Sequence, residues 1–248
     1  EKYGNNFPLL IKILNANDWL SIQVHPDDEL AQSRHNGLGK TEMWYVAEAE
    51  PGAELISGFN REMDAEQYLY DLNNGTLKDI LNYEKVKKGD VFFMPAGRVH
   101  ALGPGLLIFE IQQSSDLTYR IYDFDRVDDK GNARQLHTDL ALDALDFKQY
   151  DSYRTEYSPE FNRTVPIVES KYFNTSLIHF DKPVVKDYSG LDSFVILQCA
   201  EGECFVEYES GSETLRAGEV LLVPAIMERI QITPKPEAKI LEIYYPQD

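Results

Sequence analysis

Short apolar runs alternate with turns along most of this chain. Many of the runs are rich in Val, Ile, Leu, Phe and Tyr and are bounded by Gly, Pro, Asn or Asp, which is the pattern of half-buried β-strands. Several short strands separated by turns are typical of a β-barrel or a β-sandwich. Strands are expected over residues 9–14, 20–24, 43–47, 91–94, 106–112, 194–198, 204–208, 220–223 and 240–245.

Two regions break this rhythm with helical signals. Asp64-Ala65-Glu66-Gln67 has the pattern of a capping box that opens a helix, and Thr76-Leu77-Lys78-Asp79 opens a second one. Residues 134–148 carry leucines at helical spacing. We therefore expect a helical insert over about residues 60–83 and a further short helix later in the chain.

An internal repeat gives the domain organisation. Residues 89–96 and residues 218–225 both read Gly, acid, four apolar residues, Pro and Ala, at a constant offset of 129 positions. A Gly-acid turn before a buried strand is a hairpin signal, so the repeat predicts two barrels of one type. The stretch 149–164 is polar, rich in Tyr and poor in aliphatic residues. We place the boundary there, between domains of residues 1–150 and 151–248.

Charge and composition exclude several classes of function. The 42 acidic and 24 basic residues give a formal net charge of -18, which repels nucleic acid. No apolar run approaches the roughly 18–20 residues needed to span a bilayer. Two cysteines are too few for a disulfide framework, so we expect a reducing cytoplasm. For the assembly we expect a monomer or a homodimer. The first residues carry neither Met nor a signal peptide, and we expect residues before position 1 to be missing.

The first copy of the repeat continues into a metal-binding pattern. Gly89-x5-Pro95-x-Gly97-x2-His100 resembles the second motif of the cupin superfamily, in which the histidine is a metal ligand. This resemblance implies a mainly β fold of two cupin-type jelly-roll barrels with a few short inserted helices. The second copy has Arg229 where the first has His100, so the second barrel is expected to be metal-free.

Partners for His100 are found upstream. Gln23 and His25 alternate on one strand, so their side chains share a face and both can reach one ion. Glu42 leads into another predicted strand. Together, Gln23, His25, Glu42 and His100 form a mixed nitrogen and oxygen donor set. Such a set suits a borderline divalent ion such as zinc and leaves room for water or a substrate oxygen.

Dense motifs over about residues 7–126 then give a more specific resemblance. They resemble the type I phosphomannose isomerases, and most of all the short bacterial form with two cupin barrels. Family members normally have a further stretch before the first of these motifs. The segments that carry the resemblance are Phe7–Lys12, Leu20–Asp28, Gly39–Tyr45, Pro95–Gly103 and Glu110–Arg120.

The resemblance implies a reaction and a set of roles. One Zn²⁺ per chain is held by the four positions already named, and mannose 6-phosphate and fructose 6-phosphate interconvert by proton transfer between C1 and C2 through a cis-enediol. Arg120 matches an arginine with a catalytic role at the mouth of the site, and Lys40 matches a lysine near the sugar. Glu110 and Asp116 match acidic positions lining the cleft, and Ser21 matches a serine proposed to meet the phosphate.

The proposed reaction requires the same residue types on physical grounds. Moving a proton next to a carbonyl develops negative charge on the carbonyl oxygen, which a metal ion, Arg or Lys stabilises. The base is Glu110, Asp116 or Lys40, and the sequence does not choose between them. A phosphate must also be held against the net charge of -18, and Lys40, Arg98 and Arg120 are the cations available for it.

Two other readings stay open from the sequence. Two histidines and a glutamate also suit ferrous iron, as in a cupin oxygenase. A non-catalytic bicupin that only binds sugar is the alternative from outside the enzymes. In each sugar-related reading the partner is a small sugar phosphate, with no nucleic acid and no membrane.

Overall fold

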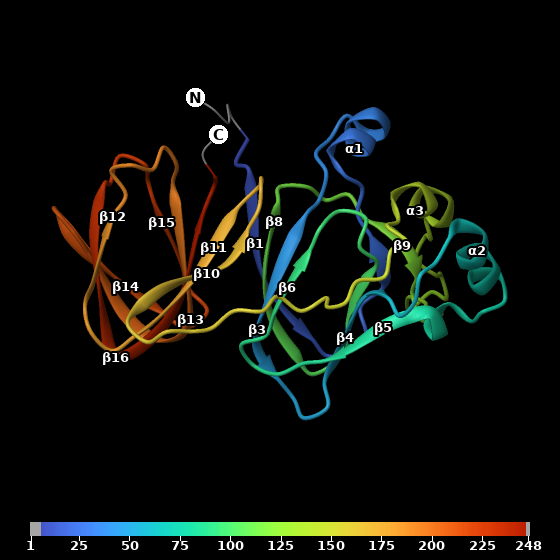
Figure 1. The fold of residues 1–248 in the computed structure, drawn as a ribbon, viewed down its shortest axis with the longest axis horizontal. Helices are drawn as coiled ribbons and strands as arrows, with labels where there is room; N and C mark the ends of the chain where they lie inside the picture. The colour runs from blue at the N-terminus through green and yellow to red at the C-terminus, as the bar shows by residue number, and fades with distance from the viewer. Residues whose placement is uncertain (1–5, 247–248) are drawn as a thin grey trace. The chain divides into compact units, whose positions relative to one another are not determined.

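The structure is a computed structural model that describes residues 6–246. The fold is mainly β, and the chain divides into two compact units, unit 1 (Glu1–Thr155) and unit 2 (Glu156–Asp248). All named strand pairs in both units are antiparallel (Figure 1). None of the helices in the described part of the chain is long and apolar enough to cross a membrane.

Unit 1 consists of two sheets. One has the strand order β1-β8-β3-β6, and the other has the order β5-β4-β7-β2-β9. The strands are β1 (Leu9–Ala16), β2 (Ile22–Val24), β3 (Glu42–Ala49), β4 (Glu54–Phe59), β5 (Leu81–Lys85), β6 (Val91–Met94), β7 (His100–Leu102), β8 (Leu106–Gln113) and β9 (Tyr119–Tyr122).

Helices lie in the connections of unit 1. They are α1 (Asp28–His35), α2 (Ala65–Asn73), the 3-10 helix η1 (Leu77–Ile80) and α3 (Thr138–Ala144). Helix α1 begins where the Asp27 carboxylate accepts a hydrogen bond from the Leu30 amide at 2.9 Å. Helix α2 begins in the same way at Asp64, whose carboxylate accepts from the Gln67 amide at 2.8 Å. The caps satisfy amide groups that the first turn of a helix leaves unpaired.

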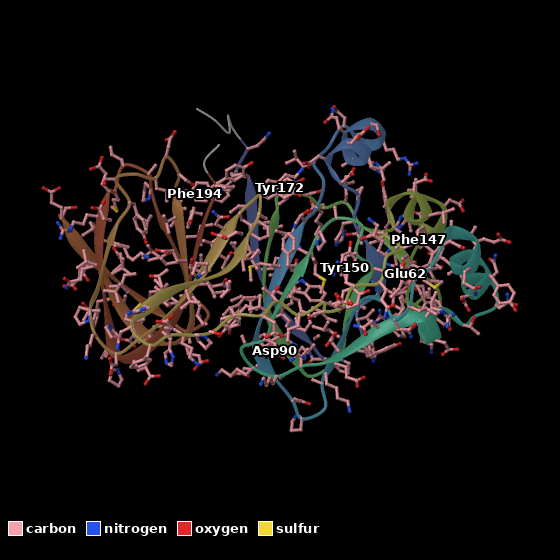
Figure 2. The ribbon with its side chains drawn as sticks, viewed as in Figure 1. Glu62, Asp90, Phe147, Tyr150, Tyr172 and Phe194 are labelled. Atoms are coloured by element: carbon pink, nitrogen blue, oxygen red, sulfur yellow. The ribbon has the colours of Figure 1, made fainter. Side chains whose placement is uncertain are left out.

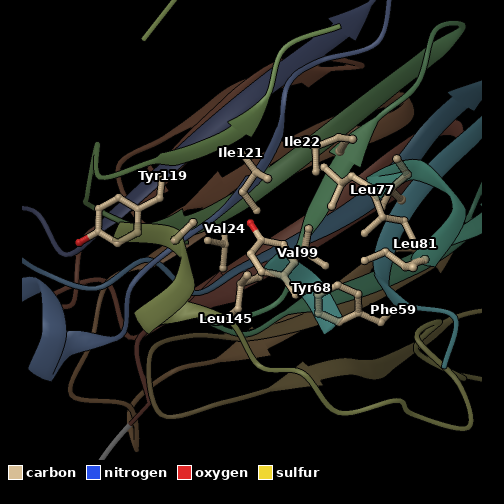
Figure 3. Packing of buried hydrophobic residues seen from close by; sticks show 14 residues of the cluster. Ile22, Val24, Phe59, Tyr68, Leu77, Leu81, Val99, Tyr119, Ile121 and Leu145 are labelled. Atoms are coloured by element: carbon tan, nitrogen blue, oxygen red, sulfur yellow. The ribbon is translucent and has the colours of Figure 1, made fainter. Parts of the chain in front are cut away.

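Two apolar clusters hold unit 1 together. The first contains residues of both sheets, among them Trp44 on β3 and Leu102 on β7, and so lies between the sheets. The second joins β2, β4, β7 and β9 to α2, η1 and α3 (Figure 3). The five-stranded sheet is therefore covered by helices on one face and by the other sheet on its opposite face.

Unit 2 has one sheet of seven strands. Its main order is β10-β11-β16-β13-β14, with β12 paired to β16 and β15 paired to β13. The strands are β10 (Arg163–Glu169), β11 (Asn174–Phe180), β12 (Val184–Asp187), β13 (Val195–Tyr208), β14 (Gly211–Arg216), β15 (Val220–Val223) and β16 (Arg229–Tyr244). Long strands β13 and β16 each pair with several neighbours and enclose a core that includes Leu197, Ile230 and Ile240.

The structure bears out most of the predicted strands and alters the helices. Both apolar runs of the repeat form strands, β6 and β15, with the expected bounds. The helix expected over residues 134–148 is only α3, because the backbone at Leu145 is extended. The second insert helix is the 3-10 turn η1, and α1 was not expected. Strand pairing among the described residues gives open sheets, so the mainly β fold is confirmed and two closed barrels are not.

Two buried tyrosines of unit 1 give a test of this packing. The Tyr68 hydroxyl is buried among apolar side chains without a hydrogen-bond partner, whereas the Tyr153 hydroxyl donates to the Phe59 carbonyl at 2.7 Å. Tyr68→Phe should leave the free energy of unfolding unchanged or raise it, because the lost hydroxyl made no bond. Tyr153→Phe should lower it by about 1 kcal/mol. Urea unfolding of both variants decides, and an equal loss in both would contradict the assignment.

Candidate metal centre

A row of polar side chains crosses three neighbouring strands of the five-stranded sheet. Gln23 on β2 pairs with His100 on β7 and with Arg120 on β9. Directly paired residues project to the same face of a sheet. The flanking residues Ile22 and Val24 belong to the cluster under the helices. Strand alternation therefore turns Gln23, His100 and Arg120 away from the helices and toward the other sheet.

Glu42 meets this row from the four-stranded sheet. It is the first residue of β3 and its side chain is fully buried. Its Oε1 lies 3.4 Å from His100 Nε2, and its Oε2 lies 3.5 Å from His25 Nε2. One ligand atom from each of His25, Glu42 and His100 lies within 4.8 Å of the others. The two sheets thus bring together three of the four predicted metal ligands.

Backbone carbonyls orient both imidazoles of this cluster. His25 Nδ1 lies 2.8 Å from the Leu117 carbonyl oxygen, and His100 Nδ1 lies 2.8 Å from the Arg98 carbonyl oxygen. A carbonyl only accepts, so each Nδ1 carries the proton and donates it there. Each Nε2 then presents a lone pair toward Glu42. Fixing the tautomer through the distal nitrogen is how proteins orient histidines that bind metals.

The charge state of the cluster suits a divalent cation. Burial, with the positive charge of Lys40, holds the pKa of His25 well below its usual value. Burial lowers the pKa of His100 to about 4, so both rings stay neutral near pH 7. Burial and the charge of Glu110 raise the pKa of Glu42 to about 8, so near pH 7 a cation that binds there would displace a proton from Glu42. His25 Nε2 and both carboxylate oxygens of Glu42 are buried without hydrogen-bond partners, so a cation is what the donor set fits.

Gln23 and Ser21 lie beside the cluster. Gln23 Nε2 is 3.2 Å from His100 Nε2, and the Ser21 hydroxyl donates to Gln23 Oε1 at 3.3 Å. Ser21 is buried and Gln23 is half-buried. The amide of Gln23 is therefore next to the ligand atoms, while its role as a fourth ligand stays a prediction.

Lys40 brings a positive charge to the same place. Its Nζ lies 3.5 Å from Glu42 Oε2, and its side chain is buried. Gly39 lets the backbone before Lys40 pass close to Asp27 and Asp28, because a Cβ on residue 39 would lie 2.6 Å from their backbone atoms. Only glycine lets the segment before Glu42 pass so close to the start of α1.

Glu110 is held by two residues that the sequence analysis did not select. Its Oε1 accepts from Lys12 Nζ at 3.0 Å, and its Oε2 accepts from Trp44 Nε1 at 2.9 Å. Lys12 also donates to Gln112. Strand alternation could have pointed to Trp44 and Gln112, because Trp44 is two residues after Glu42 and Gln112 is two residues after Glu110. Both therefore share the face of the residue that was selected.

Arg120 and Asp116 differ in how well they are placed. Arg120 Nη1 donates to the Gln135 carbonyl at 2.8 Å, and its Nε is buried without a hydrogen-bond partner. Asp116 is exposed on the connection between β8 and β9. The geometry therefore fixes Arg120 next to the polar row and leaves Asp116 at the surface.

Arg98 has a structural contact of its own. Its guanidinium lies over the rings of Tyr150, labelled in Figure 2, and Tyr153, at 4.5 and 4.6 Å from their centroids. Its carbonyl also orients His100. Two cation–π contacts satisfy the buried cation. The predicted role of Arg98 toward phosphate stays a prediction, to which the structure adds this second function.

In unit 2 an apolar residue takes the place of Glu42. Val195 pairs with Val223 across β13 and β15, as Glu42 pairs with Met94 across β3 and β6. Val223 and Met94 hold the same position in the repeat. Val195 is buried in the core of unit 2 and offers no metal ligand.

The counterpart of His100 in the repeat, Arg229, is exposed on β16. Gln23 and His100 form the inward pair of β2 and β7, and Lys186 and Ile230 form the inward pair of β12 and β16. Ile230 is buried in the core, while Arg229 is exposed. Arg229 begins β16 as His100 begins β7, at the offset that the repeat predicts, but its exposed side chain lies outside the core that Ile230 enters.

Comparisons with known proteins give a family likeness. A family model described as "Phosphomannose isomerase type I, catalytic domain" matches residues 1–55, which include Gln23, His25 and Glu42. The mannose-6-phosphate isomerase of Streptococcus mutans is 39% identical over 229 residues, which cover 90% of this chain and 72% of that protein.

A solved structure extends the likeness to the fold. The crystal structure of the mannose 6-phosphate isomerase from Bacillus subtilis superposes with a TM-score of 0.88 at 33% sequence identity. The match covers 97% of this chain and 76% of that chain. Both units of the present chain therefore lie within the region of likeness.

Removal of one imidazole tests the cluster as a metal centre. His25→Ala should weaken Zn²⁺ binding by more than about 100-fold, since changes to residues that only orient a ligand already cost about 10–100-fold. Competition with a coloured chelator measures the affinity. His35→Ala is the matched control, because His35 contacts the Tyr119 hydroxyl at 2.8 Å and lies outside the cluster. Equal affinities in the two variants would refute the assignment.

Proposed function

Because the chain belongs to the mannose-6-phosphate isomerase family, we propose that it interconverts mannose 6-phosphate and fructose 6-phosphate by proton transfer through a cis-enediol. The enzyme class follows from the family, and the chemistry is inferred from the site. One observation carries the inference. A buried carboxylate and two neutral imidazoles converge with unpaired ligand atoms, and cationic side chains lie beside them.

We further propose that the resident ion is one Zn²⁺ per chain. His25, Glu42 and His100 would hold it, with Gln23 as the fourth ligand. Nitrogen and oxygen donors of this kind suit zinc, and such sites keep a position open in catalysis. When bound, the ion supplies a Lewis acid for the carbonyl oxygen of the open-chain sugar.

The cationic side chains stabilise the charge that proton transfer creates. Negative charge develops on the oxygens at C1 and C2 as the proton leaves carbon. Lys40 is buried beside Glu42, and Arg120 is held next to Gln23, so both cations are preorganised where that charge appears. Preorganised charges are usually the largest single contribution to such a step.

We propose that the base is one of the two buried candidates. Of the three candidates, Lys40 and Glu110 are buried at the cluster and Asp116 is exposed. A base must reach the substrate carbon through a fixed geometry, which favours the buried pair, and Glu110 over Lys40 wherever Lys40 acts as a cation. The carboxylate of Glu110 accepts hydrogen bonds from Lys12 and Trp44, which hold it in one orientation.

Phosphate binding uses the remaining predicted residues. Ser21 offers a hydroxyl beside Gln23, and Arg120, Arg98 and Lys40 offer positive charge in a protein whose net charge is -18. Charge-assisted hydrogen bonds are the strong contacts to phosphate. Asp116 would contact sugar hydroxyls from the surface. No nucleic acid or membrane has a part in this function, which we place in the cytoplasm.

We propose that unit 2 is a metal-free cupin-type barrel and that unit 1 is the catalytic one. Val195 takes the position of Glu42, and Arg229, which takes that of His100, is exposed, which supports a catalytic unit 1 and a metal-free unit 2. A cupin iron oxygenase would use a similar donor set of two histidines and a carboxylate. The relatives with 39% and 33% identity favour the isomerase.

Isomerisation in D₂O tests the reaction and its mechanism together. Mannose 6-phosphate should convert to fructose 6-phosphate, and deuterium should enter at the carbon that exchanges its proton, because an enediol intermediate is reprotonated by a group in contact with solvent. Proton NMR of both sugars measures the label. Turnover without label would replace proton transfer by direct hydride shift, and sugar binding without turnover would leave a non-catalytic binding protein.

Chelation should remove activity before it unfolds the chain. The three apolar clusters contain none of the proposed ligands, so they persist without the ion. We expect EDTA to lower activity by more than about 10-fold while the main melting transition remains. Circular dichroism and the isomerase assay on one sample measure both. Simultaneous loss of activity and folded signal would show that the metal holds the fold.

A further inference from the structure

Arg120 is clamped by the segment of residues 134–137. The Arg120 amide donates to His137 Nδ1 at 3.1 Å, and the His137 amide donates to the Arg120 carbonyl at 2.7 Å. Arg120 Nη1 donates to the Gln135 carbonyl at 2.8 Å. The main chain and the guanidinium are thus held by the same few residues. A displacement of residues 134–137 would therefore displace Arg120 as well.

Asp123 fastens that segment to β9. Its carboxylate is buried, with 5% of the residue exposed. Arg134 Nε donates to Asp123 Oδ2 at 2.7 Å, and a second nitrogen of the same guanidinium donates to Oδ1. Arg126 pairs with the same carboxylate. A bidentate arginine–carboxylate pair fixes orientation as well as distance. Arg134 therefore ties the start of the clamping segment to the end of the strand that carries Arg120.

The backbone after Asp123 takes a conformation that needs such support. Phe124 and Asp125 both have φ of 56°, in the left-handed region that non-glycine residues seldom adopt. Two consecutive residues of this kind persist only where the surroundings determine them. The Arg126 amide donates to the Asp123 carbonyl at 3.2 Å, and the Tyr122 hydroxyl donates to Asp125 at 2.8 Å. The turn is therefore held from both sides.

Charge gives Asp123 a second effect on the arginine. Burial lowers the pKa of Arg120, and the positive charges of Arg134 and Arg126 lower it further, while the charge of Asp123 opposes them. The arginines around this carboxylate would repel one another without it. Asp123 is the anion that lets these positive charges gather beside the site.

We infer that Asp123 is a positioning residue for the reaction, which acts by fixing residues 134–137 and through them the guanidinium of Arg120. The inference rests on the proposed function, in which Arg120 stabilises developing charge. Asp123 itself does not need to touch the substrate. Its effect on the reaction must then pass through Arg120, and this requirement can be tested.

A double-mutant cycle in the full chain gives the test. Asp123→Asn should lower kcat/KM about 10- to 100-fold, since a displacement of about 1 Å at a site has effects of this size. In an Arg120→Ala background the same substitution should change kcat/KM by less than about 3-fold, because the group it positions is gone. Steady-state kinetics with mannose 6-phosphate, at equal metal content, measure all four proteins.

Two further variants guard against a simple folding defect. Arg134→Gln removes the link to the segment while Asp123 keeps Arg126, and it should lower kcat/KM in the same direction. Asp128→Asn is the control. Asp128 is in the same connection and bonds the Lys130 and Asn132 amides, with no contact to Arg120 among its hydrogen bonds. Its kcat/KM should equal that of the wild type.

Several outcomes would overturn the inference. Unchanged kcat/KM in Asp123→Asn would do so, as would an equal loss with and without Arg120. Failure of the proposed function looks different, because the wild type itself would then be inactive. In that case the ¹⁵N–¹H signal of Arg120 Nε decides the positioning. Loss or broadening of the signal in Asp123→Asn, but not in Asp128→Asn, supports the inference, and a signal identical to wild type refutes it.

Discussion

The rest of the structure must accommodate three buried ligand atoms. They lie between the two sheets of unit 1 and have no hydrogen-bond partners. His25 Nε2 and the two oxygens of Glu42 are buried and have no hydrogen-bond partner among the described residues. Leaving such groups unpaired costs about 1–3 kcal/mol each, and more when the group is charged. The surrounding strands must overcome this cost by apolar packing. A bound cation would remove this cost, so binding of the ion and the free energy of unfolding are linked.

Strand register and connecting segments each determine a different part of the geometry of the site. The register of β2, β7 and β9 places Gln23, His100 and Arg120 in one row. Connecting segments then supply the carbonyl groups that orient the imidazoles, from Leu117 and Arg98. An error of one residue in register would turn the row into the apolar cluster under the helices. The sheet therefore fixes which groups meet, and the loops fix how they point.

The sequence predicted the local part of this arrangement and missed the long-range part. Alternation put Gln23 and His25 on one face, and the repeat identified the strand before His100. Alternation could place Trp44 on the face of Glu42, but neither pattern could show that Lys12 and Trp44 share Glu110. Lys12 and Glu110 are 98 residues apart in the chain, and Trp44 and Glu110 are 66 apart. The same limit applies to Arg229, since the repeat could not show that its side chain is exposed while Ile230 is buried. Roles taken from family resemblance gave the reaction, whereas the support of Arg120 by Asp123 became visible only in three dimensions.

Unit 2 also contains a buried carboxylate, and there the cation that pairs with it is a side chain of the same chain. Glu242 is buried and accepts from Lys186 at 2.8 Å and from the Tyr188 hydroxyl at 2.6 Å. Glu110 in unit 1 is paired in the same manner, by a lysine and an aromatic donor. Glu42 differs from both, since its nearest cation is Lys40 at 3.5 Å and its oxygens stay unpaired. A buried carboxylate that the chain itself leaves short of positive charge is one that an external cation can satisfy, and this shortage distinguishes a binding site from a structural ion pair.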